Sequence, residues 1–252
     1  VSSLGLEVEP YSRREVEYPA ITEAHAASSL DSPQEARELW GKPPSLAVSE
    51  PQGRLLPLSC PPAEELPQDT IEDVILRRGS SRRFRRSPIT FQQLSVMLDR
   101  AARPVPTDFL GDADATLNQL YLIANDVADL PSGTYVFRRD VGALEQLEEG
   151  DFRDQAGRLD LGQELSADAS VNVYSLTDLN AVLERYGNRG YRMAQMEASI
   201  TAGRLYLAAY AQRLGATGLT FFDDEVTEFF SPHAAGKSVM FLLAVGRPAR
   251  RG

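Results

Sequence analysis

The sequence predicts an α+β domain, in which helices and strands are intermixed without the strict alternation of a doubly wound sheet. Apolar residues recur at three- and four-residue steps in some segments, as in amphipathic helices, and form short β-branched or alternating runs in others. Ten of the 16 prolines fall within residues 1–70, where they break any long helix. We therefore expect residues 1–68 to form a proline-rich N-terminal arm or linker, and residues 69–252 to form the domain.

The helices of the first half are predicted by their caps. In the arm, Pro33–Trp40 is the one segment that we expect to be helical, with Asp31 or Ser32 as its N-cap. Asp69 or Thr70 can cap a helix that runs to Arg78 and is ended by Gly79. Thr90 can cap a second amphipathic helix, Phe91–Arg103. An arginine-rich turn therefore joins two helices.

The second half alternates between strands and helices. Aromatic and branched residues predict strands at Leu117–Ala124, Thr134–Arg138, Ser170–Tyr174 and Ser238–Val245. A short helix is expected at Asp223–Phe230. The strongest helical pattern runs from Tyr191 to Leu214, where Gly215 supplies the stop. Its apolar face is expected to contain Met193, Met196, Ile200, Gly203, Leu207, Ala211 and Leu214.

Composition and charge exclude several classes of protein. With 252 residues, 42% hydrophobic and 25% charged, the chain suits one large folded domain or a domain with an extension. Its single cysteine excludes an intrachain disulfide, and two histidines leave few ligands for a metal. The net charge of -10 argues against a nucleic-acid partner. No apolar run is long enough to span a membrane and no secretory signal is present, so we expect a cytoplasmic protein without membrane contacts.

Six arginines within ten residues could carry chemistry. They are Arg77, Arg78, Arg82, Arg83, Arg85 and Arg86. The positive charges in such a cluster repel one another unless negative groups lie beside them. The arginines are therefore either paired with the surplus of Asp and Glu or available to a bound anion. Arg78, Ser80 and Arg82 alternate, and in extended chain they would point to one side, as donors suited to the oxygens of a phosphate.

The segment Ile75-Leu-Arg-Arg-Gly-Ser-Ser-Arg-Arg-Phe84 resembles the N-terminal flavin motif, Arg-x-Ser-x-Arg/Lys-x-Phe, of the nitroreductase-like flavoenzymes. Further segments, in the family's order, resemble its SagB-type dehydrogenase branch. They are Leu130-Pro-Ser-Gly-Thr-Tyr135, Arg185-Tyr-Gly-Asn-Arg-Gly-Tyr-Arg192, Leu214-Gly-Ala-Thr217, Phe222-Asp-Asp224 and Val245-Gly-Arg-Pro248. The ordered set, from about Asp69 to Pro248, is far more specific than any single piece.

The resemblance implies a nitroreductase-like fold with a central, mainly antiparallel sheet flanked by helices, and an intertwined homodimer with FMN in a groove between subunits. By position, Arg78, Ser80 and Arg82 would hold the phosphate and ribityl chain, and Thr220 and Phe221 would lie beside the flavin ring. Asn118 could offer an amide contact. Arg247, Arg250 or Arg251 could supply a C-terminal phosphate contact. The long helix would form much of the dimer core.

Several positions depart from the family pattern. Relatives carry Glu-Ala-Gly-His-x-x-Gln-Asn in the long helix, where this chain has Glu197-Ala-Ser-Ile-Thr-Ala-Gly-Arg204. Azoline-oxidising members use a Lys-Tyr pair where this chain has Arg185-Tyr186, and an arginine cannot act as a base. Phe221 could stack on the flavin or block its substrate face.

The function implied by the resemblance is an FMN-dependent oxidoreductase that works by ping-pong electron transfer through flavin N5. Its donor would be NAD(P)H or an oxidisable small molecule or peptide ring. This requires no protein nucleophile, because the cofactor carries the chemistry. The alternative is a flavin-free structural or partner subunit of a tandem or heteromeric oxidoreductase, which would suit the departures from the pattern.

Overall fold

A computed structural model describes residues 12–41, 43–44, 46, 50–111 and 114–249, together with Gly5 and Glu9. The helices in chain order are α1 Pro19–Ala27, α2 Pro33–Glu38, α3 Ile71–Arg77, α4 Phe91–Ala101, α5 Arg153–Leu159, α6 Glu164–Asp168, α7 Leu179–Tyr186, α8 Arg189–Ala211 and α9 Asp223–Phe229, with a 3-10 turn at Ala63–Glu65. The strands are β1 Leu55–Pro57, β2 Phe84–Arg85, β3 Ile89–Thr90, β4 Asn118–Ala124, β5 Val127–Ala128, β6 Gly133–Arg138, β7 Ala143–Glu149, β8 Val171–Thr177, β9 Gly215–Gly218 and β10 Ser238–Pro248.

The central sheet has the strand order β1-β7-β6-β4-β8-β10-β2, and β9 pairs with β10 beside β2. Every ladder in this sheet is antiparallel, whereas β3 and β5 form a separate parallel pair. The predicted α+β class with a mainly antiparallel sheet flanked by helices is therefore confirmed.

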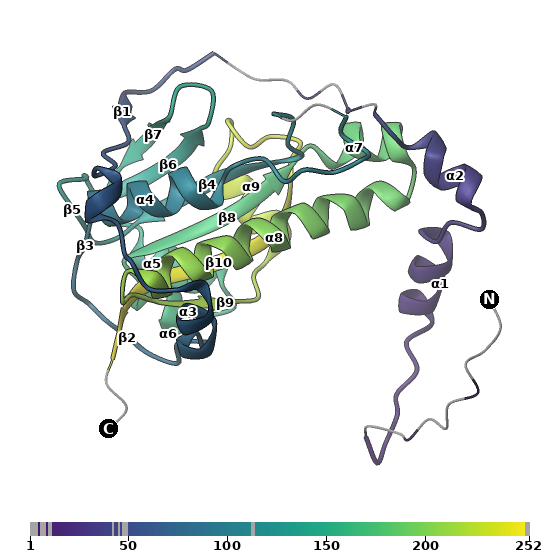
Figure 1. Cartoon of the computed structure of the whole chain (residues 1–252), viewed down its shortest axis with the longest axis horizontal. Coiled ribbons are helices and arrows are strands. Elements are labelled where there is room, and N and C mark those ends of the chain that lie inside the picture. The colour runs from purple at the N-terminus through teal and green to yellow at the C-terminus, as the bar shows by residue number, and fades with distance from the viewer. Residues whose placement is uncertain are drawn as a thin grey trace.

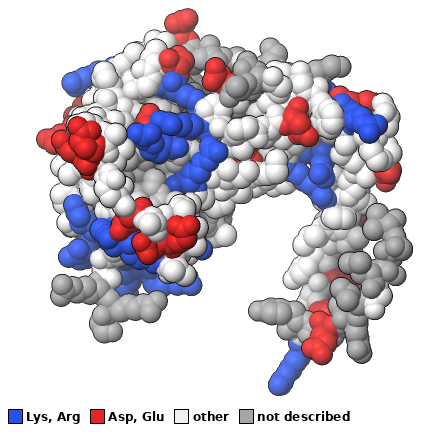
Figure 2. Space-filling view, in the orientation of Figure 1, with Lys and Arg blue, Asp and Glu red and all other residues white. Residues whose placement is uncertain are grey.

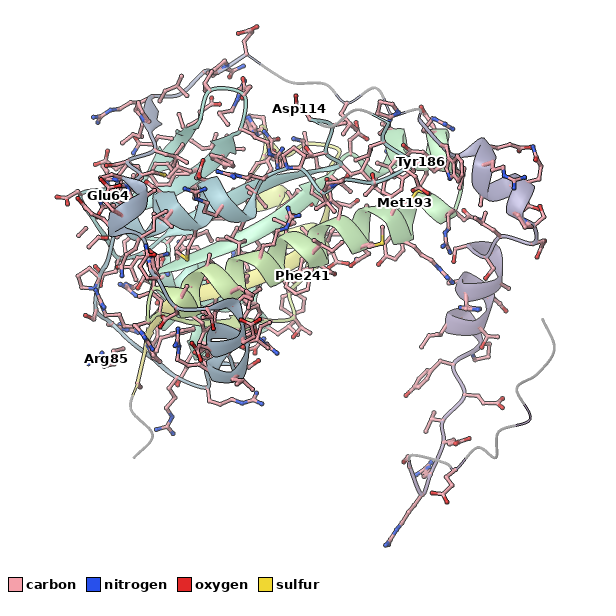
Figure 3. The ribbon with its side chains drawn as sticks, viewed as in Figure 1. Glu64, Arg85, Asp114, Tyr186, Met193 and Phe241 are labelled. Carbon is pink, nitrogen blue, oxygen red and sulfur yellow. The ribbon has the colours of Figure 1, made fainter. Side chains whose placement is uncertain are left out.

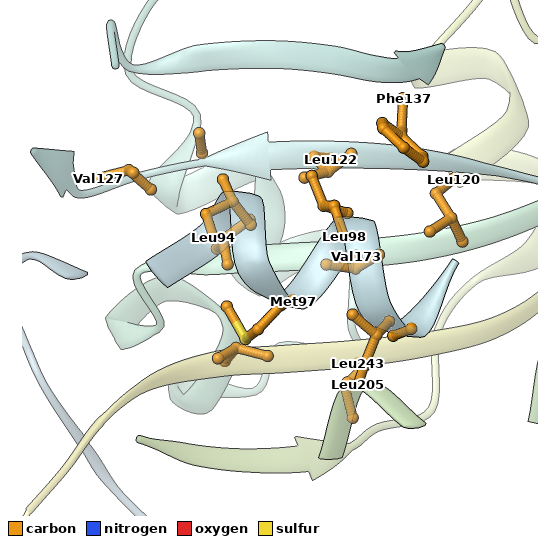
Figure 4. Close-up of a cluster of buried hydrophobic side chains, with 14 of the residues drawn as sticks. Leu94, Met97, Leu98, Leu120, Leu122, Val127, Phe137, Val173, Leu205 and Leu243 are labelled. Atoms are coloured by element: carbon orange, nitrogen blue, oxygen red, sulfur yellow. The ribbon is translucent and has the colours of Figure 1, made fainter. Parts of the chain in front are cut away.

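The two faces of the sheet carry separate hydrophobic clusters, because successive side chains of a strand point to opposite faces. In β4, Leu120 and Leu122 lie in the cluster covered by α4 and α8, and Tyr121 and Ile123 lie in the cluster covered by α5 and α9. Figure 4 shows the first cluster, in which leucines and a methionine of α4 pack on β4, β8 and β10.

Most predicted elements are present at nearly the predicted bounds. Thr90 caps α4 and Thr70 caps α3, each by accepting a hydrogen bond from the backbone three residues on, and Ser32 caps α2 in the same way. The four predicted strands correspond to β4, β6, β8 and β10, and the last two helical predictions to α8 and α9.

The prediction for the N-terminal arm is wrong in one respect, because Pro19–Ala27 is a second helix there. None of the residues of α1 is buried, so no apolar pattern could reveal it. The arm also contributes β1, which pairs with β7 at the edge of the sheet. Figure 1 shows α1 and α2 at the opposite end, beside the start of α8. There Arg189 donates to the Ser28 carbonyl and Arg192 to the His25 carbonyl, at 3.3 and 3.0 Å.

Helix α8 has the predicted length but packs on a different face from the predicted one. The side that meets the sheet contains Ala194, Ala198, Ala202, Leu205 and Ala209, all buried. Met196 and Ile200, from the predicted apolar face, are 45% and 36% exposed. Small alanines let α8 lie close to the sheet, whereas Met193, from the predicted face, is buried with them. Within the described ranges, no helix is both long and apolar enough to cross a bilayer.

Candidate functional site

The arginine turn, residues 77–86, links α3 to β2 and lies against the edge strand β9. The Ser81 amide donates to the Ala216 carbonyl at 2.9 Å, which fixes the turn to this strand. A Cβ atom on Gly215 would collide with the Ser81 hydroxyl. Glycine at this position therefore permits the close approach of the turn to the sheet.

The six arginines divide into paired and unpaired groups. Arg77 forms an ion pair with Asp69 at 3.0 Å and donates to the Tyr210 carbonyl, and Arg86 pairs with Asp168 at 2.6 Å. Arg78, Arg82, Arg83 and Arg85 have exposed side chains. Within the described part of the chain, these side chains form no hydrogen bond or ion pair. Basic side chains accordingly gather at this corner, beside the acidic residues of α3 (Figure 2). The turn thus keeps cations available to an anion.

Tyr206 of α8, which is not among the predicted site residues, contacts several parts of the turn. Its hydroxyl accepts a hydrogen bond from the Gly218 amide at 2.7 Å and lies 3.3 Å from the Ser80 hydroxyl. The Arg78 guanidinium lies over its ring, 5.4 Å from the centroid, in a cation–π contact. Arg78, Ser80 and Gly218 are therefore gathered around one side chain, while Arg82 remains exposed on the same turn.

The C-terminal arginines lie at the other side of the turn. Arg247 is the register partner of Arg85 across β10 and β2, and its Nε donates to the Pro88 carbonyl at 2.8 Å. This bond uses one of the five N–H groups of the guanidinium and leaves the others available. The predicted contacts of Arg250 and Arg251 lie outside the described residues.

Thr220 and Phe221 are held by the other face of the sheet. The Gln163 amide reaches both the carbonyl and the hydroxyl of Thr220, each at 3.3 Å. Phe221 packs against the cluster covered by α5 and α9. Gly218, two residues before Thr220, is the residue of this segment that meets Tyr206 beside the arginine turn.

Asn118 is buried and engaged with Glu197. Its Nδ2 donates to the Glu197 Oε2 at 2.7 Å, and the same oxygen accepts the backbone amides of Leu117 and Asn118. Burial raises the pKa of Glu197, against the effect of these donors and of Arg139. The Asn118 Oδ1 and the Glu197 Oε1 are both buried without a hydrogen-bond partner. The structure thus places Asn118 in a polar contact that fixes the start of β4 to α8.

The described residues bring no three His, Cys, Asp or Glu side chains together as metal ligands. The arginine turn, Tyr206 and the backbone of Gly218 form instead an open, cationic edge. A cavity of about 230 Å³ lies elsewhere, between α2 and the start of α8, lined by Trp40 and Met193 among others.

An antiparallel sheet with helices on both faces and a basic turn at one edge defines an α+β fold of the nitroreductase class. Residues 75–247 match the Nitroreductase family, and the chain belongs to that family. It is 25% identical over 205 residues to MJ1384, a nitroreductase homologue of Methanocaldococcus jannaschii; the match covers 77% of this chain and 98% of that protein.

Solved structures show the same fold. A nitroreductase homologue from Anabaena variabilis has a TM-score of 0.74 at 23% identity, over 96% of this chain and 50% of that chain. This chain therefore spans about half the length of that relative. A structure named as the oxidoreductase containing FMN has a TM-score of 0.51 at 16% identity, over 73% of this chain and 79% of that chain.

Proposed function

We propose that the chain is an FMN-dependent oxidoreductase of the SagB-type branch, and that the arginine turn binds the phosphate of FMN. The observation that carries this proposal is the exposed set of Arg78, Ser80 and Arg82, of which Tyr206 gathers the first two. Membership of the Nitroreductase family supports an oxidoreductase, and a neighbour in fold is named as containing FMN.

The residues of the turn fit a phosphate group. Two guanidinium groups and a hydroxyl supply charge-assisted donors for the oxygens of a dianion. In a chain of net charge -10, local carboxylates pair with Arg77 and Arg86, while Arg78 and Arg82 stay exposed to such a ligand. Gly218, next to the turn, is exposed to solvent on one side and has the Phe241 ring beside it on another, so a flat ring could lie against its backbone.

FMN, when bound, would supply hydride transfer at N5, from an NAD(P)H-type donor to a small molecule, or from an oxidisable ring of a small molecule or peptide. The chain would bind and orient FMN. Arg78 and Arg82 would bind its anionic phosphate end, and Tyr206 would keep Ser80 in place. Tyr186 is buried and donates its hydroxyl to the Phe109 carbonyl at 3.1 Å, and the Arg185 guanidinium lies over its ring. Because the Tyr186 hydroxyl is engaged with the backbone and Arg185 cannot act as a base, this pair does not favour azoline oxidation.

The first prediction is that Arg78→Ala combined with Arg82→Ala weakens FMN binding by about 100-fold, because two charge-assisted hydrogen-bonding groups are lost. Binding is measured from the visible spectrum of the purified protein titrated with FMN. Riboflavin, which lacks the phosphate, should bind the double variant as it binds the wild type.

Arg83→Ala is the matched control, since it removes an exposed arginine from the same turn and should leave FMN affinity nearly unchanged. Equal losses in the control and the double variant would show that only net charge matters. A wild-type protein that stays colourless and binds no FMN would favour the alternative of a flavin-free partner subunit. That alternative is supported by the departures from the family pattern and by the length of the chain, which spans about half of its Anabaena relative.

We also propose that two copies form a homodimer. The outward face of α8 carries exposed Met196 and Ile200, and α1 is a helix that buries none of its own residues in the single chain. Figure 2 shows a hollow between the body of the molecule and the arm. A second copy in this hollow would cover both surfaces and complete a groove beside the arginine turn.

A further inference from the structure

Strand β10 contains a bulge next to the candidate site. Its register against β8 shifts between Val239 and Phe241, so that Met240 is an extra residue. Val239 and Leu242 both join the cluster under α5 and α9, and the two residues between them, Met240 and Phe241, both pack on the α8 side. Bulges of this kind commonly re-aim a side chain at the edge of a site.

The bulge gives Met240 and Phe241 different environments. Met240 is buried at 4% exposure and fills the space under α8, so Phe241 is displaced toward solvent and is only half-buried. The other residues from Val239 to Gly246 are all buried. In Figure 3, Phe241 lies below α8, at the margin of the hollow between the body and the arm. An otherwise buried strand thus presents one aromatic ring there.

Phe241 adjoins the residues of the arginine turn through Gly218. A Cβ atom on Gly218 would lie 3.3 Å from the tip of the Phe241 ring, so the ring lies beside the open side of this glycine. The amide of the same glycine donates to Tyr206, which contacts Ser80 and Arg78. A cationic end, an exposed strip of backbone and an aromatic ring therefore follow one another along one edge of the sheet.

This order of groups matches a planar heteroaromatic ring that carries an anionic tail. A ring system needs a flat apolar contact and nearby backbone groups for its polar edge, while its phosphate needs cations at a distance from the apolar contact. We propose that Phe241, aimed by the bulge, is the aromatic contact for the ring system of the flavin. This inference rests on the proposed function and extends it to the end of the cofactor opposite the phosphate.

The test compares FMN and riboflavin binding to the full-length protein, because Phe241 should act on both ligands and the arginines on FMN alone. We expect Phe241→Ala to weaken both by about tenfold and to reduce the quenching of bound-flavin fluorescence. Phe241→Tyr should retain wild-type affinity, and Phe241→Leu, which keeps an apolar side chain and preserves the fold, should lose the quenching. Phe222→Ala is the matched control, as Phe222 is a phenylalanine with 44% exposure in the neighbouring segment.

The outcomes separate the two proposals. A wild type that binds neither flavin would overturn the proposed function and this inference together. A wild type that binds FMN, with unchanged affinity and quenching in Phe241→Ala and Phe241→Leu, would overturn this inference alone. Loss of affinity that accompanies a change from dimer to monomer in light scattering would also overturn it, because Phe241 would then act as a subunit contact.

Discussion

At the scale of single residues, Asp160 is a carboxyl group held in the interior near the candidate site. Its two oxygens both accept from the Tyr174 hydroxyl, at 3.0 and 3.2 Å. Desolvation by burial raises its pKa from 3.8 to about 7. Its backbone carbonyl accepts from the Gln163 amide that also reaches Thr220.

The raised pKa predicts how stability depends on pH. The folded state holds the Asp160 proton more tightly than the unfolded state does. Protonated Asp160 therefore contributes fully to the free energy of unfolding below about pH 4, and this contribution is lost as pH rises through about 7. Asp160→Asn lacks this titrating group. Between about pH 4 and 7, its free energy of unfolding should therefore fall less steeply than that of the wild type, by up to about 1.4 kcal/mol per pH unit. Urea unfolding at several pH values measures the difference.

Asp154→Asn, an exposed change on helix α5, whose C-cap is Asp160, should reproduce the wild-type pH profile. Identical pH profiles for Asp160→Asn and the wild type would show that folding does not raise the pKa of Asp160.

Residue patterns located the arginine turn but not its partners. The spacing of Arg78, Ser80 and Arg82 is local and can be read from the sequence. Tyr206 lies 126 residues beyond Ser80, and only the fold brings the two hydroxyls together. A weak signal existed, since Tyr206 and Tyr210 are four residues apart on α8 and the Tyr210 hydroxyl lies 3.5 Å from that of Ser81. The contact of Asn118 with Glu197 spans 79 residues and had no local signal.

At the scale of elements, α4 shows how a short sequence motif sets the start of a helix. The Thr90 hydroxyl accepts from the Gln93 amide, and the Gln93 side chain accepts from the Thr90 amide, both at 3.0 Å. This capping box satisfies two backbone donors at the helix start. Since α4 buries Leu94, Met97 and Leu98 in the main cluster, its position affects the whole core.

We predict that Thr90→Ala lowers the free energy of unfolding by about 1 kcal/mol, because one helix-end donor loses its partner. Thr70→Ala removes the equivalent cap of α3, which buries only Val74 among its own residues. That variant should cost less, since α3 can fray without disturbing the core. Denaturant unfolding of the two variants makes the comparison, and an equal or larger loss in Thr70→Ala would contradict it.

Some elements could not be predicted because their residues lack the usual preferences. Strand β7 reads Ala-Leu-Glu-Gln-Leu-Glu-Glu, a composition that disfavours strands. Its Glu145 is nevertheless buried, because it pairs with Arg138 of β6 at 3.1 Å and accepts from the Gln52 and Gly53 amides. Strand β9 is Gly-Ala-Thr-Gly, which resembles the end of a helix until β10 pairs with it. In both cases, tertiary contacts decide the local structure.

At the scale of the whole molecule, α8 has two different faces. The alanine face packs on the sheet, and the face with Met196 and Ile200 points outward. Of the predicted apolar face, Met196 and Ile200 lie outward, whereas Met193 and Leu214 are buried in the core. A helix of 23 residues that is apolar on two sides is typical of one shared between a core and an interface. The unburied helix α1 lies beside its start, so both surfaces could be covered by one partner (Figure 1).

The last prediction concerns this outward face. In the proposed homodimer, Met196→Glu with Ile200→Glu would bury charges without partners, so the double variant should be monomeric while keeping its helical content. Light scattering after gel filtration should give twice the chain mass for the wild type and the chain mass for the variant. Val141→Glu, a charge placed at a residue with 55% exposure in the turn before β7, is the control and should remain dimeric. FMN affinity should fall with dissociation if the groove needs both copies, and a double variant that stays dimeric would place the interface elsewhere.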